Sequence, residues 1–109
     1  SIRMEKVMSY NDLLYKIDRN DKLLLYVMSE NCSVCHADFP KVEALDKKYN
    51  LNSLNIMVNE IPEAAGQLSL FTAPVVILFY KNKEMHRQAR FIDMQDFEHQ
   101  LSLMHESLK

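Results

Sequence analysis

The residues of this sequence best suited to chemistry are two cysteines, Cys32 and Cys35, which are its whole cysteine content and are separated by two residues. A thiolate at one cysteine can attack a disulfide of another molecule, and a second thiol nearby can resolve the mixed disulfide that forms. Small secreted proteins held together by disulfides typically contain more cysteines at wider spacings. The pair therefore indicates thiol–disulfide chemistry more than a structural role.

The elements predicted around the cysteines suit this chemistry. A continuous apolar run predicts a buried strand over Lys22–Ser29. Positions 29–31 lead into a helix, which is predicted by apolar residues at steps of three and four between Cys35 and Tyr49 and should kink at Pro40. Cys32 thus lies where the helix begins, and the unpaired N–H groups and partial positive charge of a helix amino end stabilise a thiolate. We expect Cys32 to be the nucleophile and Cys35, one helical turn further on, to be the resolving thiol.

His36 follows the second cysteine and leaves other interpretations of the pair open. Cys-x-x-Cys-His is the attachment motif of c-type haem, with the histidine as an axial ligand, although such domains are mostly helical and this chain predicts two strong strands. A zinc site would need four ligands, and the other histidines, His86, His99 and His105, are scattered along the chain. A buried structural pair is a further alternative. We favour redox chemistry, in which a cationic His36 would help to stabilise a thiolate or would simply face solvent.

Composition narrows the range of functions. The chain is 48% hydrophobic and 26% charged, with a net charge of -2, which is typical of a globular domain and carries no electrostatic signature of nucleic-acid or anionic-membrane binding. Its longest apolar runs, at positions 23–28 and 75–80, are far shorter than the ~20 residues of a transmembrane helix. Gly66 is the only glycine, which argues against a P-loop, a GxGxxG loop and nucleotide chemistry.

The rest of the chain predicts alternating strands and helices. We expect a helix opened by Ser9 and Asp12, strands at Leu54–Val58, Ala73–Tyr80 and Glu84–Ala89, a short helix at Glu63–Leu68, and a last helix capped by Asp93 with its apolar stripe at Met94, Phe97, Leu101, Met104 and Leu108. Arg3–Met8 is a candidate for one more strand. This order predicts an α/β fold in one domain, 1–109, with a central mixed sheet of four to five strands and helices on both faces.

Four features together resemble the thioredoxin family over nearly the whole chain: the buried strand, Cys-Ser-Val-Cys at a helix start, Pro40 eight residues after Cys32, and Ala73-Pro74 before a strong strand. The resemblance implies a thioredoxin-like fold and thiol–disulfide exchange, with the Cys32–Cys35 disulfide as the redox centre and no separate cofactor. It also implies a cis bond between Ala73 and Pro74, and a substrate-binding groove that includes Asn31, Ala73 and Pro74.

The sequence also departs from the pattern of that family. Asn31 stands where the family has a tryptophan, Tyr26 stands where it has a buried aspartate that accepts the proton of the resolving thiol, and Ser33-Val34 replaces Gly-Pro between the cysteines. Without that carboxylate, Cys35 needs water or another base. Tyr26, His36 and Glu30 are therefore candidate modulators of the cysteine pKa values. We expect Glu30 to be an exposed loop charge, and the alternative is that it opposes thiolate formation by like-charge repulsion.

Two of the departures concern missing glycines. Lys83 stands where the family has a glycine in a turn, so we expect Asn82 to take the left-handed conformation. Arg90 and Phe91 place bulky side chains where the family has a glycine beside the substrate groove. The groove of this chain should therefore differ from that of a standard thioredoxin.

The expected function is that of an oxidoreductase that reduces disulfides of proteins or small thiols and is itself reduced by an upstream reductase. We expect a monomer in the cytoplasm with no membrane or nucleic-acid partner. The alternative from another class is a thioredoxin-fold binding or adaptor module with a slow or vestigial redox pair. A third interpretation is an extracytoplasmic oxidant or thiol carrier whose leader has been removed.

Overall fold

The computed structural model describes residues 4–107 and contains one mixed five-stranded sheet. Its strands lie in the order β1-β3-β2-β4-β5, with bounds Glu5–Lys6, Asn52–Met57, Lys22–Met28, Val75–Tyr80 and Lys83–Ala89 in that order. β1 and β2 pair parallel to β3, whereas β4 is antiparallel to β2 and to β5. The expectation of a mixed sheet of four to five strands is confirmed.

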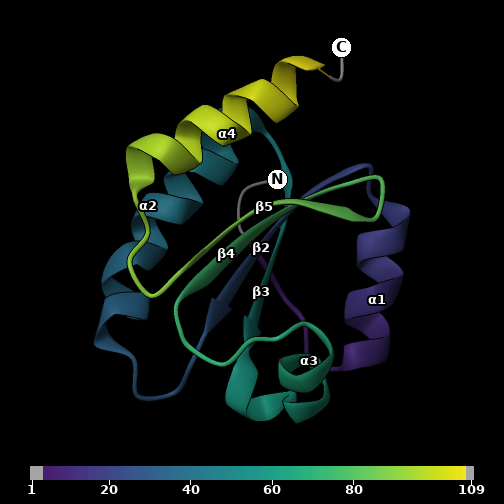
Figure 1. The fold of residues 1–109 in the computed structure, drawn as a ribbon, viewed down its shortest axis with the longest axis vertical. Helices are drawn as coiled ribbons and strands as arrows, with labels where there is room; N and C mark the ends of the chain where they lie inside the picture. Colours follow the sequence, from purple (N-terminus) through teal and green to yellow (C-terminus); the bar gives the residue numbers. More distant parts are fainter. Residues whose placement is uncertain (1–3, 108–109) are drawn as a thin grey trace.

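Four α-helices cover the two faces of this sheet (Figure 1). Their bounds are α1 Tyr10–Arg19, α2 Ser33–Tyr49, α3 Pro62–Gln67 and α4 Met94–Ser107, and a short 3-10 turn, η1, spans Val58–Glu60. α1 and α3 lie over one face, and α2 and α4 lie side by side over the other (Figure 1). Cys32 ends the connection from β2 to α2, and Cys35 lies in the first turn of α2.

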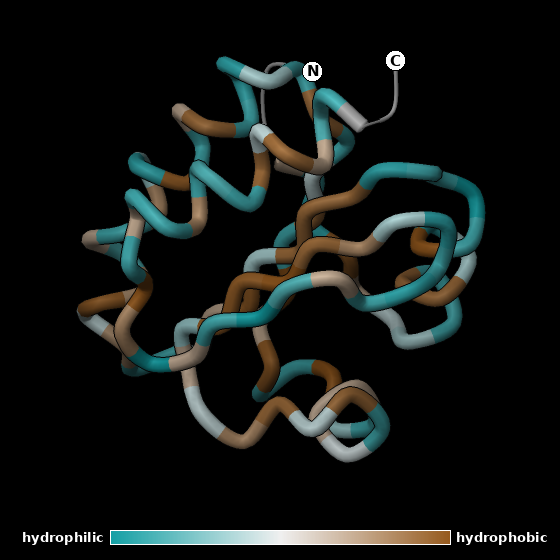
Figure 2. Tube along the Cα trace, turned by 45° about the horizontal axis from the view of Figure 1, so that its top comes forward, coloured by the Kyte–Doolittle hydropathy of each residue, from teal (hydrophilic) through white to brown (hydrophobic). Residues whose placement is uncertain are grey.

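Alternation along β2 produces the two halves of the core. Leu23, Leu25 and Val27 are buried with residues of α1 and α3, whereas Leu24 and Tyr26 are buried with residues of α2 and α4. Because both faces are covered, every residue of the strand from Leu23 onward is buried, and Figure 2 shows the hydrophobic segments gathered in the central strands. The continuous apolar run of β2 therefore results from its burial on both faces, as expected.

Several boundaries differ from the predicted ones by one or two residues. β3 begins at Asn52 and not at Leu54, because Asn52 and Ser53 already pair with Leu23 and Leu24 of β2. β4 begins at Val75, after the proline. The predicted strand Arg3–Met8 is reduced to Glu5–Lys6, with Arg3 outside the described residues, as is Leu108 of the predicted last helix.

The predicted helix starts and the turn between β4 and β5 are confirmed. The Ser9 hydroxyl accepts a hydrogen bond from the Asp12 N–H at the start of α1, and the Asp93 carboxylate accepts one from the Asp96 N–H at the start of α4. Asn82 has φ 68°, in the left-handed region as expected. α2 continues through Pro40 without a break and ends at Tyr49.

No helix among residues 4–107 combines the length and the apolar composition needed to cross a membrane.

Candidate active site

Cys32 and Cys35 form a disulfide at the junction between β2 and α2, with their Cα atoms 5.2 Å apart. Cys32 is the residue that caps α2, and its sulfur accepts a hydrogen bond from the Cys35 N–H over 3.1 Å. The first sulfur thus faces the unpaired N–H groups of the first turn. Such donors stabilise a negative charge, so the local backbone is arranged to favour a thiolate at Cys32.

The two cysteines differ in their access to solvent. Cys32 is half-buried, whereas Cys35 is 0% exposed and belongs to the core between the sheet and α2. An external sulfur can therefore approach Cys32 but not Cys35. This asymmetry matches the roles of nucleophile and resolving thiol that the sequence predicts.

Tyr26 lies beneath the first turn of α2. Its buried hydroxyl donates a 2.6 Å hydrogen bond to the carbonyl oxygen of Cys35, and its ring lies 6.1 Å from that of Phe39. Burial, and secondarily the charge of Asp38, raises the pKa of Tyr26 well above its usual value. The phenol therefore stays protonated at neutral pH, where it holds the backbone of α2 and does not act as a base.

The loop before β4 brings Ala73 and Pro74 to the same region, and their peptide bond is cis, as the resemblance implied. Pro74 is buried and Ala73 is half-buried. The carbonyl oxygen of Pro74 accepts a 2.8 Å hydrogen bond from the Arg90 N–H, which ties this loop to the end of β5. Residues far apart in the sequence therefore meet beside the disulfide.

A cavity of about 400 Å³ opens next to the disulfide. Its lining comes from the β2–α2 connection, the loop before β4 and the segment after β5: Ser29, Asn31, Cys32, Ser33, Val34, Ala73, Arg90 and Phe91. Three of the predicted site residues, Asn31, Cys32 and Ala73, are among them. We call this cavity the disulfide pocket, and it is large enough for a short stretch of a partner chain.

The other two candidate modulators, Glu30 and His36, are exposed and do not line the disulfide pocket. The Glu30 N–H donates to the side-chain oxygen of Asn59 over 3.0 Å, and the Asn59 amide donates back to the Glu30 carboxylate over 3.3 Å. His36 contributes its backbone N–H to the carbonyl of Cys32 over 3.3 Å. Within residues 4–107, neither side chain forms a hydrogen bond with a cysteine sulfur, and their role as modulators stays a prediction.

Two contributors to the site were missed by the sequence reasoning. Ser29 lines the disulfide pocket although it reads as the last residue of a strand, and Asn59 binds Glu30 from a segment 29 residues further along the chain. No local pattern marks either residue, because both act through a tertiary approach of two connections. The parallel pairing of β2 with β3 brings these connections to one edge of the sheet.

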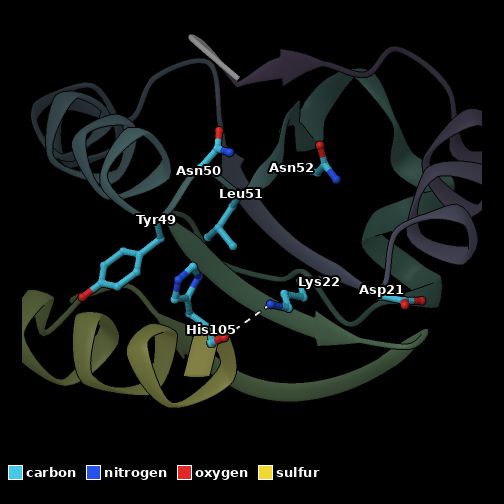
Figure 3. Close-up of a pocket in the computed structure, with 7 residues that line it drawn as sticks. All are labelled: Asp21, Lys22, Tyr49, Asn50, Leu51, Asn52 and His105. Atoms are coloured by element: carbon cyan, nitrogen blue, oxygen red, sulfur yellow. Dashed lines mark hydrogen bonds between the residues drawn. The ribbon is translucent and has the colours of Figure 1, made fainter. Parts of the chain in front are cut away.

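A second cavity, of about 310 Å³, lies at the opposite end of β2 and α2 (Figure 3). Tyr49, Asn50 and Leu51 at the end of α2 line it, together with Asp21 and Lys22, Asn52 and His105. The Lys22 ammonium donates to the carbonyl of His105 over 3.3 Å, as the dashed line in Figure 3 marks, and the ring of His105 meets that of Tyr49 edge-on at 5.5 Å. We call it the distal cavity.

Within residues 4–107, no three His, Cys, Asp or Glu side chains are grouped so as to hold a metal ion. The two sulfurs are bonded to each other.

Comparisons with known proteins give one relative at the level of sequence and many at the level of fold. The thioredoxin-like protein YdfQ of Bacillus subtilis is 36% identical over 78 residues, which cover 71% of this chain and 70% of the relative. No protein-family model matches the chain.

Among solved structures, a mutant thioredoxin from Halobacterium salinarum superposes with a TM-score of 0.84 at 19% identity, covering 93% of this chain and 89% of that one. A thioredoxin of Fasciola hepatica superposes with a TM-score of 0.83 at 21% identity, covering 92% of this chain and 98% of that one. These likenesses establish the fold, and the bacterial relative extends them to sequence.

Proposed function

We propose, from the premise that this chain belongs to the thioredoxin family, that it reduces disulfides of other proteins through Cys32 and Cys35. Membership of the family and the disulfide between the two cysteines support thiol–disulfide exchange in general. The direction of electron flow and the class of substrate are the parts that we propose.

The observation that carries the proposal is the asymmetry of the two sulfurs. Cys32 is half-buried and lines the disulfide pocket, whereas Cys35 is fully buried and does not line it. A purely structural disulfide gains nothing from exposing one sulfur to a pocket that a partner can enter. An exchange site needs this arrangement, because the first sulfur must be reached from outside and the second must be protected from it.

The proposed reaction consumes one substrate disulfide and two thiol groups of the reduced protein. The thiolate of Cys32 attacks one sulfur of the substrate disulfide, so a mixed disulfide forms and the other substrate sulfur leaves as a thiolate. Cys35 then loses its proton, and its thiolate attacks the sulfur of Cys32. The Cys32–Cys35 disulfide forms, the second substrate thiolate leaves, and the substrate has gained two electrons. An upstream dithiol reductant returns the protein to its reduced form.

The neighbouring groups would serve these two steps differently. The Cys35 N–H, 3.1 Å from the Cys32 sulfur, stabilises the attacking thiolate. Tyr26 holds the carbonyl of Cys35 and thereby the first turn of α2. Since its phenol stays protonated, Tyr26 does not accept the proton of Cys35, which goes to water or to another base such as the departing thiolate. We therefore expect resolution by Cys35, and not attack by Cys32, to limit the rate.

The test is reduction of insulin driven by dithiothreitol, with the variants Cys32→Ser and Cys35→Ser compared with the parent protein. Cys32→Ser should lower the rate to that of dithiothreitol alone, because no thiolate is left in reach of the substrate. Cys35→Ser should attack normally and accumulate a mixed disulfide, visible as a mass increase equal to the bound substrate. Insulin reduction that survives Cys32→Ser unchanged would overturn the proposal.

A second candidate, a binding module with a vestigial redox pair, is favoured by one feature: the buried position beneath the cysteines holds a neutral phenol and no carboxylate base. This candidate predicts equal binding of a partner by the reduced and the oxidised protein. A Cys35→Ser variant that forms no mixed disulfide with any disulfide substrate would favour it over the reductase.

A further inference from the structure

Arg90 is the only charged residue among those that line the disulfide pocket. Its side chain is exposed, and within residues 4–107 its guanidinium has no ion pair or hydrogen-bond partner. By contrast, Lys48 binds Glu98, and Arg87 binds Glu84 and the carbonyl of Leu68. A free guanidinium beside an exchangeable disulfide is available to a partner.

The backbone at Arg90 is held in a conformation that favours glycine. Its φ is 72°, and the N–H of Phe91 donates to the carbonyl of Ala89 over 2.9 Å, which closes a three-residue turn centred on Arg90. A non-glycine residue in the left-handed region carries strain, and such strain collects at functional sites. Glycine would remove the strain here, and the chain has arginine instead.

The carboxylate nearest in sequence to the cysteines does not cancel this charge at the pocket wall. Glu30 precedes Cys32 by two residues, but its carboxylate accepts a hydrogen bond from Asn59, and it is not a lining residue. The ionised side chain that a bound molecule meets on the wall of the pocket is therefore a cation. Charge complementarity then favours an anionic partner.

Two apolar side chains complete the surface around Cys32. Phe91, next to Arg90, is 80% exposed, and Val34, between the cysteines, is 42% exposed, and both line the disulfide pocket. Exposed aromatic residues beside a charged group are typical of contact surfaces. Together with Arg90 they offer contacts to a segment that carries an acidic and an apolar residue near its cysteine.

We propose that Arg90 and Phe91 select protein disulfides whose cysteine is flanked by an acidic and an apolar residue in an extended segment. Arg90 is a specificity-determining residue that pairs with the acidic side chain, and Phe91 covers the apolar one. The inference rests on the proposed function, since it names the class of substrate that the same cysteines reduce. It goes beyond that function because a chain with glycine at position 90 would have the chemistry without the preference.

The test uses three disulfide-linked peptides that differ only in the residue beside cysteine, which is Glu, Gln or Lys. We expect the parent protein to reduce the Glu peptide with a kcat/KM about threefold to tenfold above that of the Lys peptide. Arg90→Gln should abolish this preference, and Arg90→Lys, which keeps the charge, should retain it. Lys83→Gln, a matched loss of one positive charge at the other end of β5, should retain it as well.

A second measurement on the reduced protein needs no turnover. Alkylation of Cys32 by iodoacetate, an anion, is compared with alkylation by neutral iodoacetamide, and the ratio of the two rates should fall in Arg90→Gln and not in Lys83→Gln. A ratio that is unchanged in Arg90→Gln would overturn the inference that the charge of Arg90 acts at Cys32.

The outcomes separate this inference from the function on which it rests. Turnover of all three peptides at one rate would overturn the selection of acidic segments and leave the reductase intact. No turnover of any peptide would overturn the proposed function and this inference with it. A preference for glutathione disulfide that depends on Arg90, without any preference among the peptides, would overturn the assignment to a protein segment.

Discussion

The two ends of α2 use polar groups in opposite ways. At its amino end, the disulfide pocket has a half-buried sulfur, a free guanidinium and a phenylalanine that is 80% exposed. At its carboxyl end, about 24 Å away by the rise of an α-helix, Lys22 of β2 donates to the carbonyl of His105 in α4, and Tyr49 of α2 donates to Glu98 of α4, so polar residues of the distal cavity join these three elements. The polar groups at the amino end are therefore available to another molecule, whereas those at the carboxyl end form hydrogen bonds within this one.

The carboxyl end also contains the buried carboxylate of Asp46, which is 0% exposed. One of its oxygens accepts a 2.6 Å hydrogen bond from the Ser53 hydroxyl, and within the described residues the other oxygen has no hydrogen-bond partner. Desolvation raises the pKa of Asp46, and the bond from Ser53 opposes that rise. The polar groups at the amino end of α2 are thus available to a partner, whereas those at its carboxyl end stabilise the fold. We therefore expect that each end can be altered without affecting the other.

Ser53→Ala should have the largest effect on stability and should leave the amino end unchanged. Within the described residues, the Ser53 hydroxyl is the one hydrogen-bond donor to the buried Asp46 carboxylate. Its removal should therefore lower the free energy of unfolding by about 2 kcal/mol at pH 7. Urea unfolding measures the loss. Insulin reduction per folded molecule should stay at the parent rate, and a fall in that rate would break the separation of the two ends.

The pH dependence of unfolding sharpens the same comparison. Because the folded pKa of Asp46 is raised, the folded protein binds this proton more tightly than the unfolded chain does. The contribution of Asp46 to stability is therefore highest below the pKa of its carboxyl in the unfolded chain, and it is lost as pH rises through the pKa in the folded protein. Ser53→Ala raises the folded pKa further, so its destabilisation should be smaller at pH 4 than at pH 7. Equal losses at both pH values would contradict the assignment to Asp46.

Tyr26→Phe tests whether the amino end also depends on an internal contact. The substitution keeps the ring in the core and removes the donor to the Cys35 carbonyl, which should lower the free energy of unfolding by about 1 kcal/mol. Chemical denaturation of the oxidised protein measures the change. Tyr80→Phe, on the neighbouring β4, is a control, because within residues 4–107 the Tyr80 hydroxyl forms no hydrogen bond, and an equal loss in both variants would argue against the Tyr26 contact.

Arg90→Gly should move stability and substrate preference in opposite directions. Relief of the left-handed strain, less the extra entropy of glycine in the unfolded chain, should stabilise the protein by roughly 0.5 to 1 kcal/mol. The preference for an acidic substrate should be lost as it is in Arg90→Gln. Thermal unfolding and peptide kinetics measure the two quantities, and a destabilised Arg90→Gly protein would mean that the arginine side chain contributes to folding.

Glu98→Gln should have the smallest effect. The half-buried Glu98 carboxylate binds Lys48 and accepts a 2.9 Å hydrogen bond from the Tyr49 hydroxyl, and Lys48 is the main cause of its lowered pKa. Its contribution is present at neutral pH and is lost as pH falls through that lowered pKa. We expect a small drop in melting temperature that disappears in 1 M salt, where charges are screened. A drop that persists at high salt would assign the effect to the tyrosine hydrogen bond.

Much of the fold could be predicted because its signals are local. The apolar run of β2, the capping residues Ser9 and Asp93 and the turn at Asn82 each act through neighbouring atoms, and all four appear as expected. The start of β3 was misplaced, since Asn52 and Ser53 are polar and join the strand only by pairing with β2. Polar strand residues of this kind leave no apolar pattern to follow.

The candidate site likewise contains features that could be predicted from the sequence and features that could not. Spacing and the helix start were enough to mark Cys32 and Cys35, and the resemblance to thioredoxins supplied the cis bond at Pro74. The bond from the Tyr26 hydroxyl to the Cys35 carbonyl could not be predicted, because it depends on the packing of α2 against the sheet. The same holds for the contact of Glu30 with Asn59.

By itself, the sequence determined the chemistry of this protein: two thiols one helical turn apart at a helix start, where backbone N–H groups stabilise a thiolate. Only the tertiary structure decided which sulfur a partner can reach, and which charge that partner meets. Burial of Cys35 requires the core between the sheet and α2, and the place of Arg90 beside Cys32 requires β5 to return along β4 to the loop at Pro74. Access and charge depend on residues far apart in the chain, and only folding brings those residues together.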